Sequence, residues 1–183
     1  GIASRGLGDV YKRQLVNKTN IPITTTLHGL GCFPGEDKSS LGMLGMHGNY
    51  EANLAMNKCD LMINVGARFD DRVTGRLDAF SPDSVKFHID IDQSSINKNV
   101  KVDFHTNTDI TMTLKEINSF IESNDIELEK KDYANWWGQI NDWRKKECLH
   151  YEQGEETIKP QHAISRLYDL TSQKDTFITT EVG

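Results

Sequence analysis

The sequence predicts an α/β protein in which a doubly wound parallel sheet carries helices on both faces, followed by the start of a second α/β domain. Three observations predict this class. Short apolar or β-branched runs alternate with segments of helical periodicity. Glycine or acidic residues follow several of these runs directly, as they do at ligand-binding strand ends. The length of 183 residues suits one complete domain and part of another.

Four segments predict strands. Residues 22–27 are short and β-branched, and residues 61–67 form a nearly unbroken apolar run, typical of a strand covered on both faces. Residues 85–91 predict the next strand, and a further short strand is expected around residues 100–104. In a Rossmann-like sheet of this kind, ligands bind beyond the carboxyl ends of the strands.

Two segments among these strands carry helical periodicity. Residues 50–58 predict a helix that follows a glycine-rich stretch over residues 29–48. A second helix is expected from Asp109 onward, with Thr108 as its N-cap, because apolar residues then recur at helical spacing. These residues are Ile110, Leu114, Ile117 and Ile121.

The C-terminal third of the chain predicts two more helices and a strand. Aromatic and apolar residues at helical spacing favour a buried helix face over an aromatic ligand site. They are Tyr133, Trp136, Trp137, Ile140 and Trp143. Pro160 suits the first turn of a following helix, and residues 176–182 predict a strand.

These patterns divide the chain into four parts. Residues 1–14 fit none of the downstream pattern and resemble a translated sequencing adapter, so we expect them to be non-native. Residues 15–122 then form the main domain. Residues 123–157 form a linker with the aromatic helix, and residues 158–183 begin the second domain, so both ends of the chain are expected to be cuts.

Composition excludes several classes of partner. The formal net charge of −6 gives no basic surface for nucleic acid or an anionic membrane. No apolar run approaches the roughly 18 residues that span a bilayer. Cys32, Cys59 and Cys148 are odd in number and form no CxxC pair, which favours reduced thiols over a disulfide framework or a zinc site.

Chemically informative residues gather where the predicted strands end. We expect these clusters to meet in one crevice: His28, residues 66–72, residues 90–92 and residues 106–109. Gly66 would let a phosphate approach backbone N–H groups, and Arg68 would offer it a cation. Asp90, about twenty residues further on, is placed to accept hydrogen bonds from ribose hydroxyls. The pattern predicts a dinucleotide site.

Three stretches also resemble a known family. They are residues 24–62, which include LGMLGMHG, residues 63–77, which include GARFDDRVTG, and residues 86–99, KFHIDIDQSSINKN. In this order and spacing they resemble the middle domain of acetolactate synthase (acetohydroxyacid synthase) large subunits. The resemblance covers residues 15–122 and resumes over residues 158–183.

The resemblance implies a fold of three domains and a reaction that depends on thiamine diphosphate (ThDP). The family joins decarboxylated pyruvate to a second pyruvate or to 2-oxobutyrate in branched-chain amino acid synthesis. Its middle domain holds FAD, and its last domain binds ThDP through Mg²⁺. The activating glutamate and the Mg²⁺-binding GDG and NN motifs do not occur in this sequence, so we expect the chain alone to be inactive. Val182 and Gly183 match the start of the last domain.

The family's FAD contacts can be carried over residue by residue. They fall on Thr26, Leu27, His28, Gly45, Met46, His47, Gly66, Ala67, Arg68, Asp70, Asp90, Ile91 and Asp109. His28 stands where the family often has methionine, and Thr108 stands where glycine usually precedes the aspartate. Asp71 and Arg72 match the pair that lines the family's substrate channel. No metal ligand is expected in this chain, and His88 is expected to be a packed strand residue.

Three alternatives stay open. Another carboligase with FAD and ThDP, such as glyoxylate carboligase, shares the domain, although the DDR run at residues 70–72 favours acetolactate synthase. An NAD-dependent enzyme would need a G-x-G-x-x-G after the first strand, and that motif does not follow residues 22–27 here. A non-catalytic nucleotide-binding module is the third alternative. The resemblance further implies a homodimer or homotetramer of catalytic subunits, a regulatory small subunit, 2-keto acid substrates, and a bacterial cytoplasm or a plastid as location.

Overall fold

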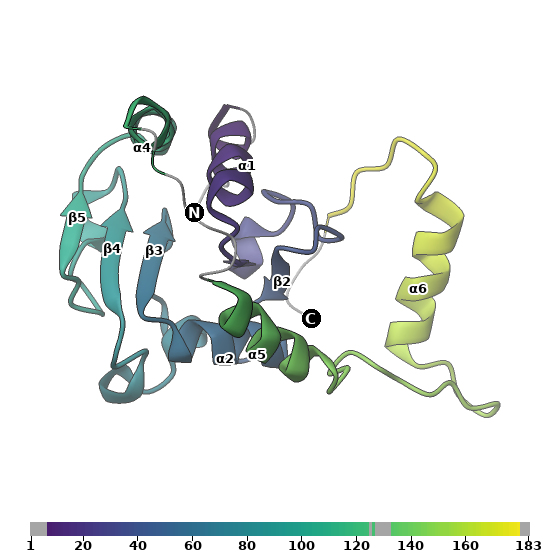
Figure 1. The fold of residues 1–183 in the computed structure, drawn as a ribbon. Coiled ribbons are helices and arrows are strands. Elements are labelled where there is room, and N and C mark those ends of the chain that lie inside the picture. The colour runs from purple at the N-terminus through teal and green to yellow at the C-terminus, as the bar shows by residue number, and fades with distance from the viewer. Residues whose placement is uncertain (1–6, 125, 127–132, 180–183) are drawn as a thin grey trace. The chain divides into compact units, whose positions relative to one another are not determined.

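The computed structural model describes residues 7–124, 126 and 133–179, and its chain divides into two compact units, Gly1–Cys148 and Leu149–Gly183. The larger unit contains two parallel sheets (Figure 1). One pairs β1 (Ile23–Thr25) with β2 (Ser40–Met43). The other has the order β3-β4-β5.

The three-stranded sheet ends evenly at its carboxyl edge. Its strands are β3 (Leu61–Val65), β4 (Val85–Ile89) and β5 (Phe104–Thr106). In the parallel register Val65 lies beside Ile89, and Ile89 lies beside Thr106. The segments that follow the three strands therefore leave the sheet at the same edge, as the sequence predicted for a parallel sheet.

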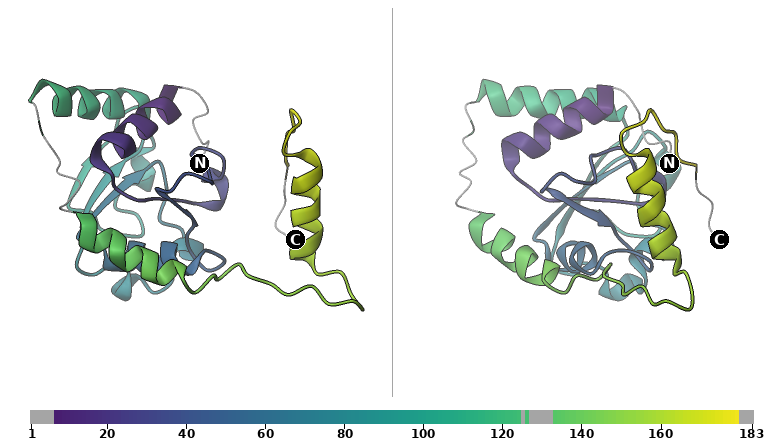
Figure 2. Two further views of the ribbon diagram at one scale, coloured as in Figure 1. Left: turned by 45° about the vertical axis from the view of Figure 1, so that its right-hand side comes forward. Right: turned by 90° about the vertical axis from the view of Figure 1, so that its right-hand side faces the viewer.

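Helices flank the strands in two pairs. Figures 1 and 2 show α1 (Leu7–Thr19) beside α4 (Ile110–Ser123) on one side, and α2 (Tyr50–Lys58) beside α5 (Ala134–Arg144) on the other. The predicted α/β class with helices on both faces is confirmed. One short helix, α3 (Asp71–Thr74), and three 3₁₀ turns complete the unit: η1 (Leu27–Gly29), η2 (Leu77–Ala79) and η3 (Gln93–Ser95).

Helix α1 contains most of the segment that the sequence analysis set aside as non-native. Residues 7–14 form its first turns, and the helix packs on α4. The buried Asn118 side chain donates to Tyr11 O at 3.0 Å, and Lys18 Nζ lies 2.7 Å from Glu122 Oε1. Residues 7–14 therefore contribute to the packing of α1 against α4.

The aromatic segment folds back on the larger unit. Ile140 is fully buried with Leu41, Ala52 and Ala55, and three tryptophans pack against this cluster. They are Trp136, Trp137 and Trp143. The indole N–H of Trp137 donates to Asn20 O at 2.8 Å, which satisfies the polar end of a partly buried ring. The predicted buried aromatic face is confirmed.

Three strand predictions need correction. Strand β5 was expected around residues 100–104 but runs over Phe104–Thr106. Strand β2 lies within the glycine-rich stretch, where no strand was predicted. The predicted strand over residues 176–182 is absent from residues 176–179, and residues 180–182 lie outside the described part. A strand needs a neighbouring strand to pair its backbone N–H and C=O groups. The described residues of the smaller unit contain one helix, α6 (Pro160–Thr171), and no strand. Pro160 does begin that helix, as predicted.

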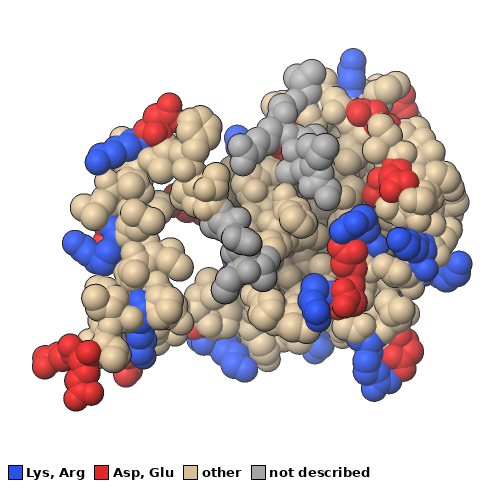
Figure 3. Space-filling model, turned by 180° about the vertical axis from the view of Figure 1, so that it is seen from behind, with Lys and Arg blue, Asp and Glu red and all other residues tan. Residues whose placement is uncertain are grey.

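The surface carries no extended patch of one charge on the face drawn in Figure 3, where Lys and Arg lie beside Asp and Glu. Within the described residues, no helix is both long and apolar enough to span a membrane.

Candidate functional site

The carboxyl edge of the β3-β4-β5 sheet brings three of the four predicted clusters together. Gly66, after β3, donates its backbone N–H to Ile89 O at 2.8 Å. Asp90, after β4, donates its backbone N–H to Thr106 O at 3.2 Å. These bonds continue the ladder one residue beyond the strands, so the segments that contain Gly66, Asp90 and residues 106–109 start from adjacent positions.

The turn after β3 is held in an uncommon backbone conformation. Gly66 has φ +67° and the buried Phe69 has φ +55°, both in the left-handed region that L side chains rarely adopt. Asn64 fixes the turn with two bonds, because its amide donates to Ala67 O at 2.6 Å and accepts from Ala67 N at 3.2 Å. Such clustering of constrained backbone is typical of ligand-binding turns.

Gly66 has a packing role as well. A Cβ at this position would lie 2.7 Å from Ile110 Cδ1. The missing side chain therefore also permits close contact with the first turn of α4, in addition to the ligand approach predicted from sequence.

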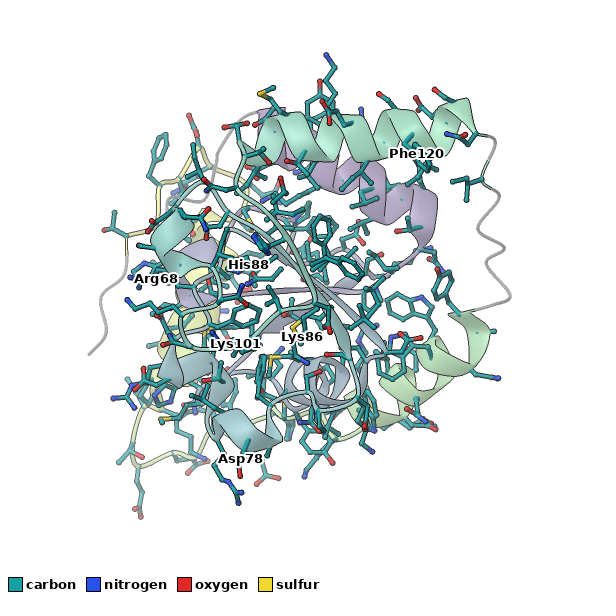
Figure 4. The ribbon with its side chains drawn as sticks, turned by 90° about the vertical axis from the view of Figure 1, so that its left-hand side faces the viewer. Arg68, Asp78, Lys86, His88, Lys101 and Phe120 are labelled. Carbon is teal, nitrogen blue, oxygen red and sulfur yellow. The ribbon has the colours of Figure 1, made fainter. Side chains whose placement is uncertain are left out.

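Arg68 and Asp70 form an ion pair at the mouth of this turn. Arg68 Nη2 lies 2.9 Å from Asp70 Oδ2, and the two side chains are 54% and 46% exposed. Solvent screens a pair this exposed, so it contributes little to stability. Arg68 lies at the periphery of the molecule in Figure 4, where its guanidinium can reach an anionic ligand.

Asp90 is the most buried carboxylate among the predicted site residues, with 6% exposure. Its Oδ1 accepts the backbone N–H of Asp92 at 2.9 Å, and its Oδ2 lies 3.5 Å from His88 Nε2. Asn107 holds the backbone from the neighbouring segment, donating to Asp90 O at 3.0 Å and to Ile91 O at 2.8 Å. Ile91 itself is 69% exposed, so a solvent-exposed apolar side chain directly follows the buried Asp90.

The pKa values of two groups near Asp90 are shifted from their ordinary values. Burial lowers the pKa of His88, and the adjacent Asp90 carboxylate opposes that shift. The Ser94 hydroxyl and backbone N–H lower the pKa of the exposed Asp92 by hydrogen bonding to its carboxylate. His88 is fully buried, which confirms the prediction of a packed strand residue.

Asp109 acts as a helix cap, a role that the sequence analysis gave to Thr108. Asp109 Oδ1 accepts the backbone N–H groups of Thr111 at 2.8 Å and Met112 at 3.2 Å. The Thr108 hydroxyl instead bonds the hydroxyls of Thr106 and Thr113, at 3.0 and 2.6 Å. The cap prediction was wrong because α4 begins one residue later than a Thr108 cap requires.

A second glycine loop is joined to the predicted channel pair. Met46 donates its backbone N–H to Arg72 O at 2.8 Å. Gly45 has φ +96°, and a Cβ there would strike Arg72 O. Asn53 of α2 fixes Gly45 from the other side, accepting from Gly45 N at 2.8 Å and donating to Gly45 O at 2.9 Å. These bonds therefore hold the loop of residues 45–47 directly against residues 71–72.

The side chains of these two joined segments are exposed to solvent. Met46 is 63% exposed, and His47 is also exposed. Arg72 and Asp71 are 71% and 81% exposed, with 3.9 Å between Arg72 Nη1 and Asp71 Oδ2. An adjacent exposed pair of this kind stabilises the fold little, so both side chains are available for other contacts.

The fourth cluster lies on the other sheet. Thr26 caps η1 by accepting the backbone N–H of Gly29 at 3.2 Å, and Leu27 and His28 within the turn are exposed. The contacts described for Thr26 stay within this turn, and residues 26–28 follow β1. The structure therefore joins three predicted clusters at one edge through direct bonds and places this one at the end of β1, in the other sheet.

The side chains that hold the site together were not predicted from the sequence. They are Asn53, Asn64, His88 in its relation to Asp90, and Asn107. Asn64 offered a signal, because an amide inside an apolar strand is uncommon and must find hydrogen-bond partners. Within the described residues, no group of three or more His, Cys, Asp or Glu is placed to hold a metal ion.

Comparisons with known proteins identify the family of this chain. The sequence model of the thiamine pyrophosphate enzyme central domain matches residues 11–117. The chain is 39% identical to the acetolactate synthase isozyme 3 large subunit of Escherichia coli K12 over 171 residues, which are 93% of this chain and 30% of that protein. It is 39% identical to the acetolactate synthase large subunit of Haemophilus influenzae and 40% identical to chloroplastic acetolactate synthase 1 of Zea mays, over 93% of the chain in each case. These matches cover 29% and 26% of the two relatives, so the chain spans less than a third of the proteins it resembles.

Proposed function

Because the chain belongs to the thiamine pyrophosphate enzyme family, whose central domain it carries, we propose that it is the FAD-binding part of an acetolactate synthase large subunit. The observation that supports this most is the shared edge of three strands, where a constrained glycine turn, an exposed guanidinium and a buried acid lie together. A dinucleotide needs these three groups. Backbone N–H groups and a cation suit the pyrophosphate, and an acid suits ribose hydroxyls.

Each predicted residue has a role in this proposal. Gly66, Ala67 and Arg68 receive the pyrophosphate, with Asp70 orienting the guanidinium. Asp90 accepts from the ribose. The remaining flavin contacts are Thr26, Leu27, His28, Gly45, Met46, His47, Ile91 and Asp109.

Asp71 and Arg72 line the proposed substrate channel. The backbone bond from Met46 to Arg72 supports this role, since it joins the channel residues to a loop assigned to the flavin. Their exposed side chains offer a carboxylate and a guanidinium for contact with a 2-keto acid. The structural role of FAD would then include shaping the channel.

The proposed reaction condenses decarboxylated pyruvate with pyruvate or 2-oxobutyrate. Thiamine diphosphate, held with Mg²⁺ in another domain, supplies the electron sink for decarboxylation. The condensation has no net redox change, so the domain described here binds FAD for structure and excludes water from one side of the channel. This chain by itself is proposed to be inactive.

Assembly and location follow the relatives. Two of the three compared proteins are named large subunits, which supports a complex of catalytic homodimers or homotetramers with a regulatory small subunit. The relatives include bacterial and chloroplastic enzymes. A bacterial cytoplasm is the proposed location, and a plastid is the alternative.

The test uses the full-length enzyme that contains this chain. We expect it to purify yellow, with a flavin absorbance spectrum, and Arg68→Ala to weaken FAD binding about tenfold by removing a charge-assisted hydrogen bond. The matched control is Arg76→Ala, which breaks the exposed Arg76–Asp78 pair of the same i, i+2 spacing outside the site. A colourless but fully active wild-type enzyme would overturn the assignment, and so would equal FAD affinity in the two variants.

A further inference from the structure

His88 is buried directly beneath the proposed nucleotide site. It is the residue before the last of β4, its side chain is 0% exposed, and Figure 4 places it inside the molecule while Arg68 lies at the periphery. The Phe69 ring meets the imidazole edge-on, with 5.3 Å between centroids. In the register of the sheet, Asn64 of β3 and His105 of β5 lie on either side of it.

Neither imidazole nitrogen has a well-aligned hydrogen-bond partner among the described residues, although the Asp90 carboxylate and the Ala67 carbonyl lie near the ring. A buried nitrogen without a partner costs about 1–3 kcal/mol, so such a group in a folded protein calls for a physical reason. The Asp90 carboxylate offers one, since its Oδ2 lies 3.5 Å from His88 Nε2. A shift of about half an ångström would bring the pair to ordinary hydrogen-bond length.

Asp90 is already fixed at its other oxygen. Oδ1 accepts the backbone N–H of Asp92 at 2.9 Å, so an imidazole N–H on Oδ2 would hold the carboxylate at both ends. Each carboxylate oxygen keeps a second lone pair. The acid would then present two free acceptor positions in a fixed direction.

We propose that His88 is a positioning residue for nucleotide binding: its neutral imidazole, protonated at Nε2, donates to Asp90 Oδ2 and fixes that carboxylate for the ribose hydroxyls of the flavin nucleotide. The inference rests on the proposed function and assigns a role to a residue that does not itself touch the ligand. Burial lowers the pKa of His88, which keeps the ring neutral at pH 7 with a single N–H. Two acceptors lie near this ring, the Asp90 carboxylate and the Ala67 backbone carbonyl. The carboxylate is charged and is therefore the stronger acceptor.

The test is a double-mutant cycle on FAD affinity, measured by quenching of flavin fluorescence in the full-length apoenzyme. His88→Phe keeps a ring of similar size but removes the donor, and we expect the Kd for FAD to rise about tenfold. In the Asp90→Asn background the same change should have less than a twofold effect, because His88 acts through the carboxylate. His88→Gln, which restores an N–H donor, should recover part of the affinity.

The matched control is His105→Phe, on the neighbouring strand in register but exposed, which should leave the Kd within twofold. Equal effects of His88→Phe with and without the Asp90 carboxylate would show a purely structural role and overturn the inference.

A second readout needs no flavin. Nitrogen-15 chemical shifts of labelled histidine in this chain at pH 7 should show His88 as the Nε2–H tautomer, and an Nδ1–H tautomer would overturn the inference. Failure of the wild-type enzyme to bind FAD would instead overturn the proposed function, so the two failures are distinguishable.

Discussion

His88 couples the stability of the fold to pH. Burial lowers its pKa in the folded state, with Asp90 acting against the shift and His105 adding to it, while β3 presents the neutral Asn64 at the paired position. The unfolded chain therefore binds a proton near pH 6.5 that the folded chain resists. This contribution to stability is complete above about pH 6.5 and is lost as the pH falls toward the lower folded pKa.

We predict that His88→Phe flattens the acid side of the stability profile. Between about pH 6.5 and pH 5, the slope of unfolding free energy against pH should decrease by as much as roughly 1.4 kcal/mol per pH unit. Urea unfolding at a series of pH values measures it. His105→Phe is the control and should retain more of the wild-type slope, whereas an unchanged slope in His88→Phe would contradict the prediction.

Between elements, Asn53 of α2 connects the glycine loop to the channel segment. Its amide makes two bonds to the buried Gly45, and the next residue, Met46, bonds Arg72 O. Gly45 lies between β2 and α2 with φ +96°, and its carbonyl also accepts the Gly48 backbone N–H at 3.0 Å. The side chain of one helix therefore fixes two loops that are far apart in the sequence.

We predict that Asn53→Ala lowers the unfolding free energy by about 1–2 kcal/mol, because the Gly45 N–H loses its acceptor and the Gly45 carbonyl keeps only the Gly48 N–H. Hydrogen exchange at the Met46 amide should accelerate at the same time, since Asn53 no longer holds the loop that brings this amide to Arg72 O. Asn57→Ala, on the same helix, removes one exposed bond to Ala79 O at 3.2 Å and should cost less than 1 kcal/mol. Equal losses in the two variants would show that Asn53 has no special role.

Across the whole chain, the larger unit has a core of its own. Ile140 of α5 is fully buried in it, and Cys148, at its end, still contacts α2, with 3.3 Å between Cys148 Sγ and Tyr50 N. In the smaller unit, helix α6 carries no buried residue. The folding free energy of the larger unit should therefore depend on the chain up to residue 148 and little on the rest.

We predict that a chain ending at Cys148 unfolds within about 2 °C of the full chain, because no core residue is lost. A chain ending at Tyr133 removes Ile140 and the three tryptophans, and it should lose several kcal/mol through the cavity left against Ala52 and Leu41. Thermal unfolding followed by circular dichroism compares the two. A large decrease already in the first truncation would show that the units share their stability.

Local sequence patterns predicted the elements in which apolar residues recur at helical or strand spacing within the segment itself. Helix α2 has the predicted bounds, and β4 starts at the predicted residue, because apolar spacing within one segment is a local property. Strand β5 was expected over residues 100–104 but runs over Phe104–Thr106, where Phe104 lies beside Phe87 of β4. Its position depends on the neighbouring strand.

Strand β2 shows the same limit more strongly. Its residues, SLGM, contain no β-branched side chain and one glycine, so nothing local favours an extended conformation. The segment is a strand because Ser40 lies beside Ile23 in β1. Pairing over a distance in sequence overrode weak propensity.

Residue order alone established the α/β class, the strand-end placement of Gly66, Arg68 and Asp90, and the family resemblance, since each depends on short spacings along the chain. Tertiary structure decided that Ile110 fills the space beside Gly66, that Asn53 joins two loops, and that the buried His88 lies beside the Asp90 carboxylate. These contacts join side chains across separate segments or adjust their distances by fractions of an ångström. Packing sets such distances, and no spacing in the sequence encodes them.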